Sequence, residues 1–193
     1  MHKKFYFHSL ITILALSSFS FAQNLEQIKE IKQQAIALYS TQNYDEAFKL
    51  LDNLPKNEKN EDDFLLIANI YQEKNDDNAA IQNLNKALAK NPSFYKAYYN
   101  LGCIFASRKS YLLAANNFEL AIKYNKAFSS AYYNLAYCQI KLKNYNQAKK
   151  NLLKAIELDP QNKDYYFNLA YCYKELKKEK QAKKILDAYN QMS

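Results

Sequence analysis

The sequence predicts an all-α protein, an α-solenoid of about five stacked helix–turn–helix units. Apolar residues recur at three- and four-residue spacings from Gln23 onward, as amphipathic helices require. Pro92 and Pro160 are separated by twice the repeat, and each follows a helical run that it would end. One alanine recurs along the chain in steps of 33, 34, 34 and 34, at Ala47, Ala80, Ala114, Ala148 and Ala182. A fixed period of this length is typical of stacked helix pairs, with one pair in each repeat.

Residues 1–22 have the layout of a secretory signal peptide. Lys3 and Lys4 give a basic start, an apolar run follows over 10–16, and the small residue Ala22 precedes Gln23. The apolar run is shorter than the ~20 residues that a membrane-spanning helix needs. We therefore expect an exported protein, periplasmic or secreted, that is cleaved before Gln23. An uncleaved N-terminal membrane anchor is the alternative.

Removal of residues 1–22 would leave one elongated domain, residues 23–193. Taken in register, its units are 28–60, 61–94, 95–128, 129–162 and 163–193. Pro55 ends a short second helix in the first unit, and the charged connector 56–63 that follows is the loosest joint that we expect. Small residues at the eighth, twentieth and twenty-seventh places would let helices cross closely, as with Ala136, Ala148 and Ala155. Bulky residues fill the places between them, and at the twenty-fourth place these are Leu84, Phe118, Leu152 and Leu186.

This set of positions resembles the tetratricopeptide repeat (TPR) family over nearly all of the chain after Gln23. The third unit matches the family pattern with Tyr98, Leu101, Gly102, Ala114, Phe118 and Ala121. The fourth matches with Tyr132, Leu135, Ala136, Ala148, Leu152, Ala155 and Pro160. The departures are small: Tyr or Phe replaces the first tryptophan of the pattern, Lys126 replaces a proline, and Gln139 replaces an aromatic residue. The resemblance implies a right-handed superhelix whose first helices line a concave groove.

The groove places of the family carry asparagine and aromatic residues in this chain. An asparagine side chain both donates and accepts hydrogen bonds, so a row of them suits the backbone of an extended peptide. Aromatic neighbours add apolar contact area. The alternative is that the asparagines belong to the packing pattern of the family. The candidate groove residues are Asn69, Lys96, Tyr99, Asn100, Cys103, Tyr133, Asn134, Tyr137, Lys141, Phe167, Asn168 and Tyr171.

The composition disfavours an enzyme. Both histidines, His2 and His8, lie in the signal segment, and Gly102 is the only glycine, which excludes histidine triads and glycine-rich phosphate loops after Gln23. Cys103, Cys138 and Cys172 recur about one unit apart, too far for a shared metal or a disulfide, and favour packing roles. We therefore expect a non-catalytic scaffold for a protein or peptide ligand, without cofactor or metal.

A basic surface is the alternative function. The formal net charge is +8, and twelve lysines lie between Lys141 and Lys184, in the last two units. They could attract an acidic protein, a membrane surface or nucleic acid. Nucleic acid is disfavoured because Arg108 is the only arginine and the lysines are dispersed. A further hypothesis is end-to-end self-association, because no separate capping helix follows the fifth unit in the sequence.

Overall fold

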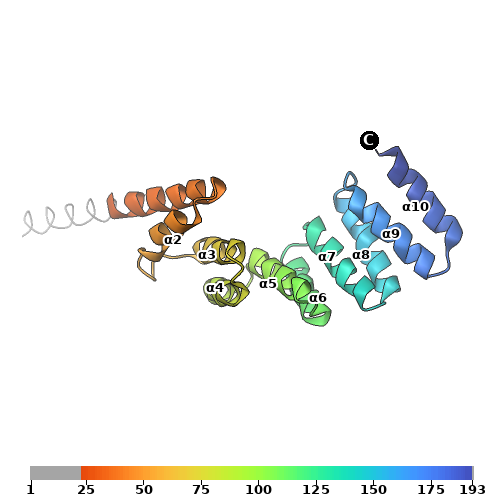
Figure 1. The fold of residues 1–193 in the computed structure, drawn as a ribbon, viewed down its shortest axis with the longest axis horizontal. Coiled ribbons are helices and arrows are strands. Elements are labelled where there is room, and N and C mark those ends of the chain that lie inside the picture. Colours follow the sequence, from red (N-terminus) through yellow and green to blue (C-terminus); the bar gives the residue numbers. More distant parts are fainter. Residues whose placement is uncertain (1–22, 193) are drawn as a thin grey trace, which may run out of the picture.

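A computed structural model describes residues 23–192, and these form an elongated stack of helices (Figure 1). A helical stretch at 23–40 comes first. The helices after it are α2 (Tyr44–Asp52), α3 (Glu61–Glu73), α4 (Asp77–Lys90), α5 (Tyr95–Ser107), α6 (Tyr111–Tyr124), α7 (Ser129–Lys141), α8 (Tyr145–Leu158), α9 (Lys163–Glu175) and α10 (Glu179–Gln191). Each helix packs mainly on the helices next to it in sequence. The predicted all-α solenoid is confirmed, whereas the predicted signal peptide lies outside the described residues.

One left-handed residue in each unit turns the chain from the first helix into the second. These residues have φ between 56° and 62° and occupy the fifteenth place of their units: Gln42, Asn75, Lys109, Lys143 and Lys177. At Lys109 the backbone N–H donates to the Ala106 carbonyl at 2.9 Å, and the next N–H donates to the Phe105 carbonyl at 2.9 Å. These bonds satisfy carbonyls that the end of α5 would leave without partners.

The recurring alanines are buried where the helices cross. Ala47, Ala80, Ala114 and Ala148 are fully buried and Ala182 is nearly so. The large residues at the twenty-fourth place fill the space beside them in the inner units, where Leu84 and Leu152 are fully buried. Leu186 was predicted to be a core residue in the same way, but it is 39% exposed. The reason is positional: no helix pair follows α10 in the described part of the chain to cover it.

The connector after α2 is tied down rather than loose. The Lys32 amino group donates to the Glu58 carbonyl at 2.7 Å and lies 2.6 Å from the Asp63 carboxylate. The buried Lys59 donates to the Asp52 carbonyl at 2.9 Å. The expectation of a loose joint at 56–63 therefore fails, because Lys32 of the first helix binds the connector's backbone and the start of α3, and Lys59 of the connector binds the end of α2.

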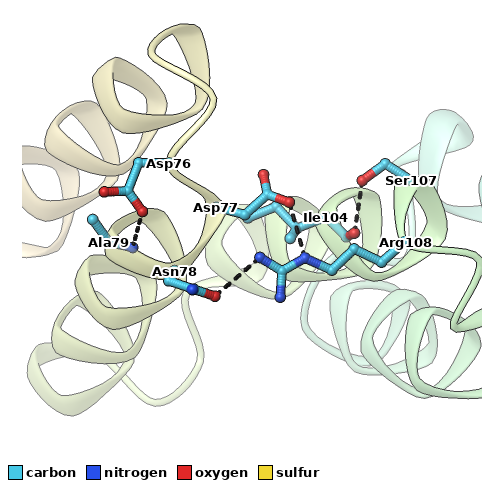
Figure 2. A network of polar contacts seen from close by, with 7 residues as sticks. All are labelled: Asp76, Asp77, Asn78, Ala79, Ile104, Ser107 and Arg108. Carbon is cyan, nitrogen blue, oxygen red and sulfur yellow. Dashed lines mark hydrogen bonds and ion pairs between the residues drawn. The ribbon is translucent and has the colours of Figure 1, made fainter.

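A polar clamp joins the second unit to the third (Figure 2). Arg108, just after α5, donates from Nε to the Asp77 carboxylate at 2.9 Å and from a terminal nitrogen to the Asn78 side-chain oxygen at 3.1 Å. Asp76 caps α4 by accepting from the Ala79 N–H at 2.9 Å. The acid at the start of one helix and the cation at the end of another both complement the helix dipoles. The clamp therefore fixes how α5 sits on α4.

Candidate functional site

The asparagines of the predicted groove form hydrogen bonds to the preceding unit. Asn100 donates from Nδ2 to the Asn69 side-chain oxygen at 2.7 Å. In the next two units the acceptor is a tyrosine hydroxyl: Asn134 donates to Tyr99 and Asn168 to Tyr133, each at 3.0 Å. We call these three inter-unit bonds the asparagine ladder. The donors that we expected to serve a peptide are thus used to tie each first helix to the one before it.

The tyrosines that accept these bonds are half-buried. The Tyr99 ring lies between Phe118 and Phe128, with ring centroids 5.7 and 4.7 Å away. Burial, followed by the neighbouring Cys103, raises the pKa of Tyr99 to about 12. Burial also raises the pKa of Tyr133 and, although Tyr99 opposes it, brings the pKa of the Cys103 thiol to about 11. These groups keep their protons near neutral pH, which is unsuited to acid–base or thiolate chemistry.

A second set of predicted residues stands open to solvent toward the C-terminal end of the solenoid, on α7 and α9. Tyr137 is 37% exposed, Tyr171 40% and Phe167 56%. The Lys141 amino group lies 5.1 Å from the centroid of the Tyr137 ring. Together with Ile140, Lys143, Tyr145 and Asn168, they line a hollow of about 350 Å³ between α7 and α9. We call this hollow the α7–α9 site.

The predicted residues nearer the N-terminus do not join the α7–α9 site. Asn69 lines a smaller hollow of about 190 Å³ with Ile36, Asp62, Asp63, Leu65 and Leu66. The Lys96 amino group lies 3.3 Å from the Asp62 carboxylate, and both side chains are exposed. The predicted strip is therefore divided into a small N-terminal hollow, the bonded ladder and the α7–α9 site.

The sequence analysis missed Tyr145, which opens α8 and lines the α7–α9 site. Its ring packs edge-on against Tyr171, with centroids 6.2 Å apart. One unit earlier Tyr111 packs in the same way against Tyr137, at 6.3 Å. The signal was the spacing of Tyr111 and Tyr145, which equals one repeat and matches the spacing of their partners.

A larger cleft that was also missed lies between α2, α3 and α4. It measures about 730 Å³, and its walls include Phe48, Phe64, Tyr71, Lys59 and Lys86. It borders the short first unit, where α2 has 9 residues while α4 has 14. The missing turns of α2 leave this space, so its origin is the truncated helix predicted from Pro55.

The remaining features considered in the sequence are the cysteines, metal ligands, membrane spans and late lysines of the described residues 23–192. Cys103, Cys138 and Cys172 are free thiols, the last two fully buried. No group of three or more His, Cys, Asp or Glu there is placed to hold a metal ion. None of the helices in this range has the length and apolar character to span a membrane. Lysines of the last two units contact separate rings, with Lys149 over Tyr173 and Lys163 over Tyr189.

Comparison with known proteins decides the family. A family model described as the C-terminal ARM domain of tetratricopeptide repeat protein 21 matches residues 19–161. A model described as a tetratricopeptide repeat matches residues 151–184. The chain belongs to the tetratricopeptide repeat family. The predicted resemblance is thereby confirmed, although no curated protein matches the sequence.

Several solved structures share the fold of this TPR chain. MamA from Desulfovibrio magneticus RS-1, residues 41 to the end, is 20% identical with a TM-score of 0.75, and the match covers 86% of this chain and 94% of MamA. A MamA structure labelled AMB-1 is 17% identical with a TM-score of 0.72, over 86% of this chain and 91% of that one. At these identities the likeness concerns the fold.

Proposed function

We propose that this TPR protein is a non-catalytic scaffold that holds a peptide or a segment of a partner protein in the α7–α9 site. One observation carries the proposal: three aromatic side chains and Lys141 stand exposed around one hollow, while the asparagine ladder beside them is internally bonded. Exposed aromatic residues with a polar neighbour are the side chains that contribute most to protein–protein binding. The TPR fold, shared with MamA, supports an interaction scaffold.

The chemistry of the α7–α9 site favours a particular kind of ligand. Tyr137, Phe167 and Tyr171 offer ring faces, and Lys141 and Lys143 place positive charge on the rim. The ligand best matched to this surface is a segment with an apolar or aromatic side chain next to an acidic one. A catalytic role has no support from Tyr99 or Cys103, because both remain protonated near neutral pH.

The test compares capture of a partner by matched variants of the chain that begins at Gln23. Crosslinking pull-downs are quantified for the parent chain, for Tyr137→Ala with Tyr171→Ala, and for Tyr124→Ala as control. Tyr124 is 39% exposed at the end of α6 and does not line the α7–α9 site. A protein lost from the double variant and kept by the control supports the site. Equal capture by all three chains contradicts it.

The same pull-downs separate the proposal from a basic-surface mode of binding. Binding that depends on neutralising phosphates weakens steeply with salt, whereas contact with aromatic rings does so much less. Capture that disappears on a moderate rise in salt but survives Tyr137→Ala with Tyr171→Ala would favour the lysines of the last two units. Asn134 and Tyr133 are poor probes of binding, because changing them breaks the ladder as well.

We also propose that the protein is exported and cleaved before Gln23, on the strength of the basic, apolar and small-residue order of residues 1–22. Intact mass measurement of the protein from its native host tests the cleavage. A mass that begins at Gln23 supports export with processing. A mass that retains Met1, in the membrane fraction, supports the uncleaved anchor instead.

A further inference from the structure

The C-terminal end of the solenoid presents an uncovered apolar face. Phe167, Tyr171 and Leu186 are 56%, 40% and 39% exposed there. With Ala170, Ala182, Lys174, Lys183 and Glu179 they line a hollow of about 420 Å³ between α9 and α10. We call this surface the end face. At the inner joints, residues equivalent to Leu186 are covered by the next unit, since Phe118 and Leu152 are at most 1% exposed.

The opposite end of the solenoid does not match the end face. In α7 the residues Ala131, Leu135 and Cys138 are all buried, and the last two pack with Ala114 and Phe118 of the preceding unit's α6. The register of the repeat places Glu30, Gln34 and Ala37 at the corresponding places of the 23–40 helix, and all three are exposed. The N-terminal end thus presents the polar side chains of Glu30 and Gln34 at places where α7 presents the buried apolar residues Ala131 and Leu135. Head-to-tail stacking of two chains would bury polar groups against the end face without partners.

The asparagine ladder also stops at the end face. Each inner tyrosine of the fifth place accepts a bond from the next unit, as Tyr133 does from Asn168. Phe167 occupies the same place in the last unit and has no hydroxyl with which to accept. Its ring instead lies 6.1 Å from that of Tyr189 in α10. The surface that covers Phe167 should therefore be apolar, unlike another asparagine-bearing first helix.

We infer that two copies of this chain associate through their end faces as a two-fold symmetric dimer. Within residues 23–192 the C-terminal end carries the apolar hollow and Glu30 and Gln34 make the other end polar, so an end-to-end contact that buries apolar surface on both copies uses the same face on each, and such a contact closes as a dimer. The charges suit this arrangement, because Glu179 lies on the same rim as Lys174 and Lys183. A two-fold axis between two such rims can bring the acid of one copy to a lysine of the other.

The size of the end face sets the strength of the contact. Helices α9 and α10 have 13 residues each, so each spans about 20 Å. Two such helices roughly 10 Å apart give a footprint of about 400 Å² on each copy. The two copies together would bury about 800 Å², below the lower limit of standard interfaces, roughly 1,200 Å². The dimer should therefore be weak and depend on concentration, with a dissociation constant on the order of 1–100 μM.

Sedimentation velocity on the chain that begins at Gln23, from about 1 to 500 μM, tests the dimer. Leu186→Glu places a charge in the lining of the end face and should raise the dissociation constant at least tenfold. Leu186 lies outside the α7–α9 site, so Leu186→Glu tests the dimer without changing that site, although Phe167 and Tyr171 line both hollows. Leu153→Glu is the matched control: Leu153 is 43% exposed on α8, close to the 39% of Leu186, and should leave the constant unchanged.

The possible results divide cleanly. A monomer–dimer equilibrium that is weakened by Leu186→Glu and kept by Leu153→Glu supports the end-face dimer. A monomer over the whole range, a dimer insensitive to Leu186→Glu, equal weakening by both variants, or species that grow beyond the dimer would each overturn it. Circular dichroism must show that both variants fold. Leu186→Asn serves as the milder change if the charged one does not.

Discussion

Gly102 lies opposite Phe118, where neighbouring units pair an alanine with a leucine. The second unit has Ala68 with Leu84, and the fourth has Ala136 with Leu152. A Cβ added at Gly102 would lie 2.6 Å from Cε1 and 2.7 Å from Cδ1 of the Phe118 ring. Carbon atoms in contact prefer about 3.5–4.0 Å. The glycine is therefore the partner that the larger ring requires, and the two positions should depend on each other energetically.

The change in the free energy of unfolding caused by Gly102→Ala is the sum of two opposing contributions. Overpacking a full core costs about 1–3 kcal/mol, and the Phe118 ring is only 1% exposed, so it has little room to move. Alanine gains up to about 1 kcal/mol over glycine inside a helix. Gly102→Ala alone should then lower the free energy of unfolding by about 1 kcal/mol. In the Phe118→Leu background the clash is gone, so the same change should raise it by up to about 1 kcal/mol.

Urea denaturation followed by far-ultraviolet circular dichroism measures this coupling. The four chains of the cycle are the parent, Gly102→Ala, Phe118→Leu and the double variant. Phe118→Leu alone should destabilise by about 1–2 kcal/mol through the cavity that it leaves, and the double variant should recover part of that loss. The reasoning is refuted if Gly102→Ala has the same effect in both backgrounds. Ala148→Ser, at a buried alanine remote from this pair, checks that the cycle reports a local contact.

Three further outcomes can be measured on single variants or on the parent chain. Asn134→Ala removes the donor to the Tyr99 hydroxyl and should lower the free energy of unfolding by about 1 kcal/mol; an unchanged urea midpoint would contradict a structural role for the ladder. Ala148→Leu overpacks a fully buried crossing and should cost about 1–3 kcal/mol, read as a lower melting temperature. Burial brings the pKa of Cys103 to about 11, so its thiol stays protonated to high pH, and alkylation by iodoacetamide should keep accelerating up to about pH 11. A rate that levels off near pH 9 would show that the thiol is solvated.

The period of the recurring alanines was sufficient to predict the fold. The buried alanines and the large residues between them recur because the helix crossings in the stack have similar shapes. The pattern of one unit therefore predicts the core positions of the others. Leu186 is an exception: it occupies a core place of the repeat but is exposed, and the period alone does not predict this. Its place in the unit is a core place, but burial depends on a following helix pair, and none is described after α10.

The candidate groove was harder to predict, because periodicity gives positions but not hydrogen-bond partners. Asn134 and Tyr99 have the same separation along the chain as Asn168 and Tyr133, so the spacing shows that the two pairs are equivalent but not that they are bonded. Whether each asparagine points to its neighbour or into the groove depends on the rotation between units, which the sequence does not state. The exposed rings of the α7–α9 site were predicted individually, whereas Tyr145 required knowing that the start of α8 reaches α9.

The joints between units use different chemistry although the helices repeat. Asn100 bonds to Asn69 at the joint where Arg108 also clamps Asp77, and in the later joints a leucine replaces that cation, as Leu142 shows. In a repeat array each unit contacts only its neighbours, so a change at one joint acts locally. Loosening the α4–α5 joint with Arg108→Ala should therefore leave the α7–α9 site intact. The polar clamp at the α4–α5 joint and the exposed aromatic rings of the proposed α7–α9 binding site therefore lie in different units of the solenoid.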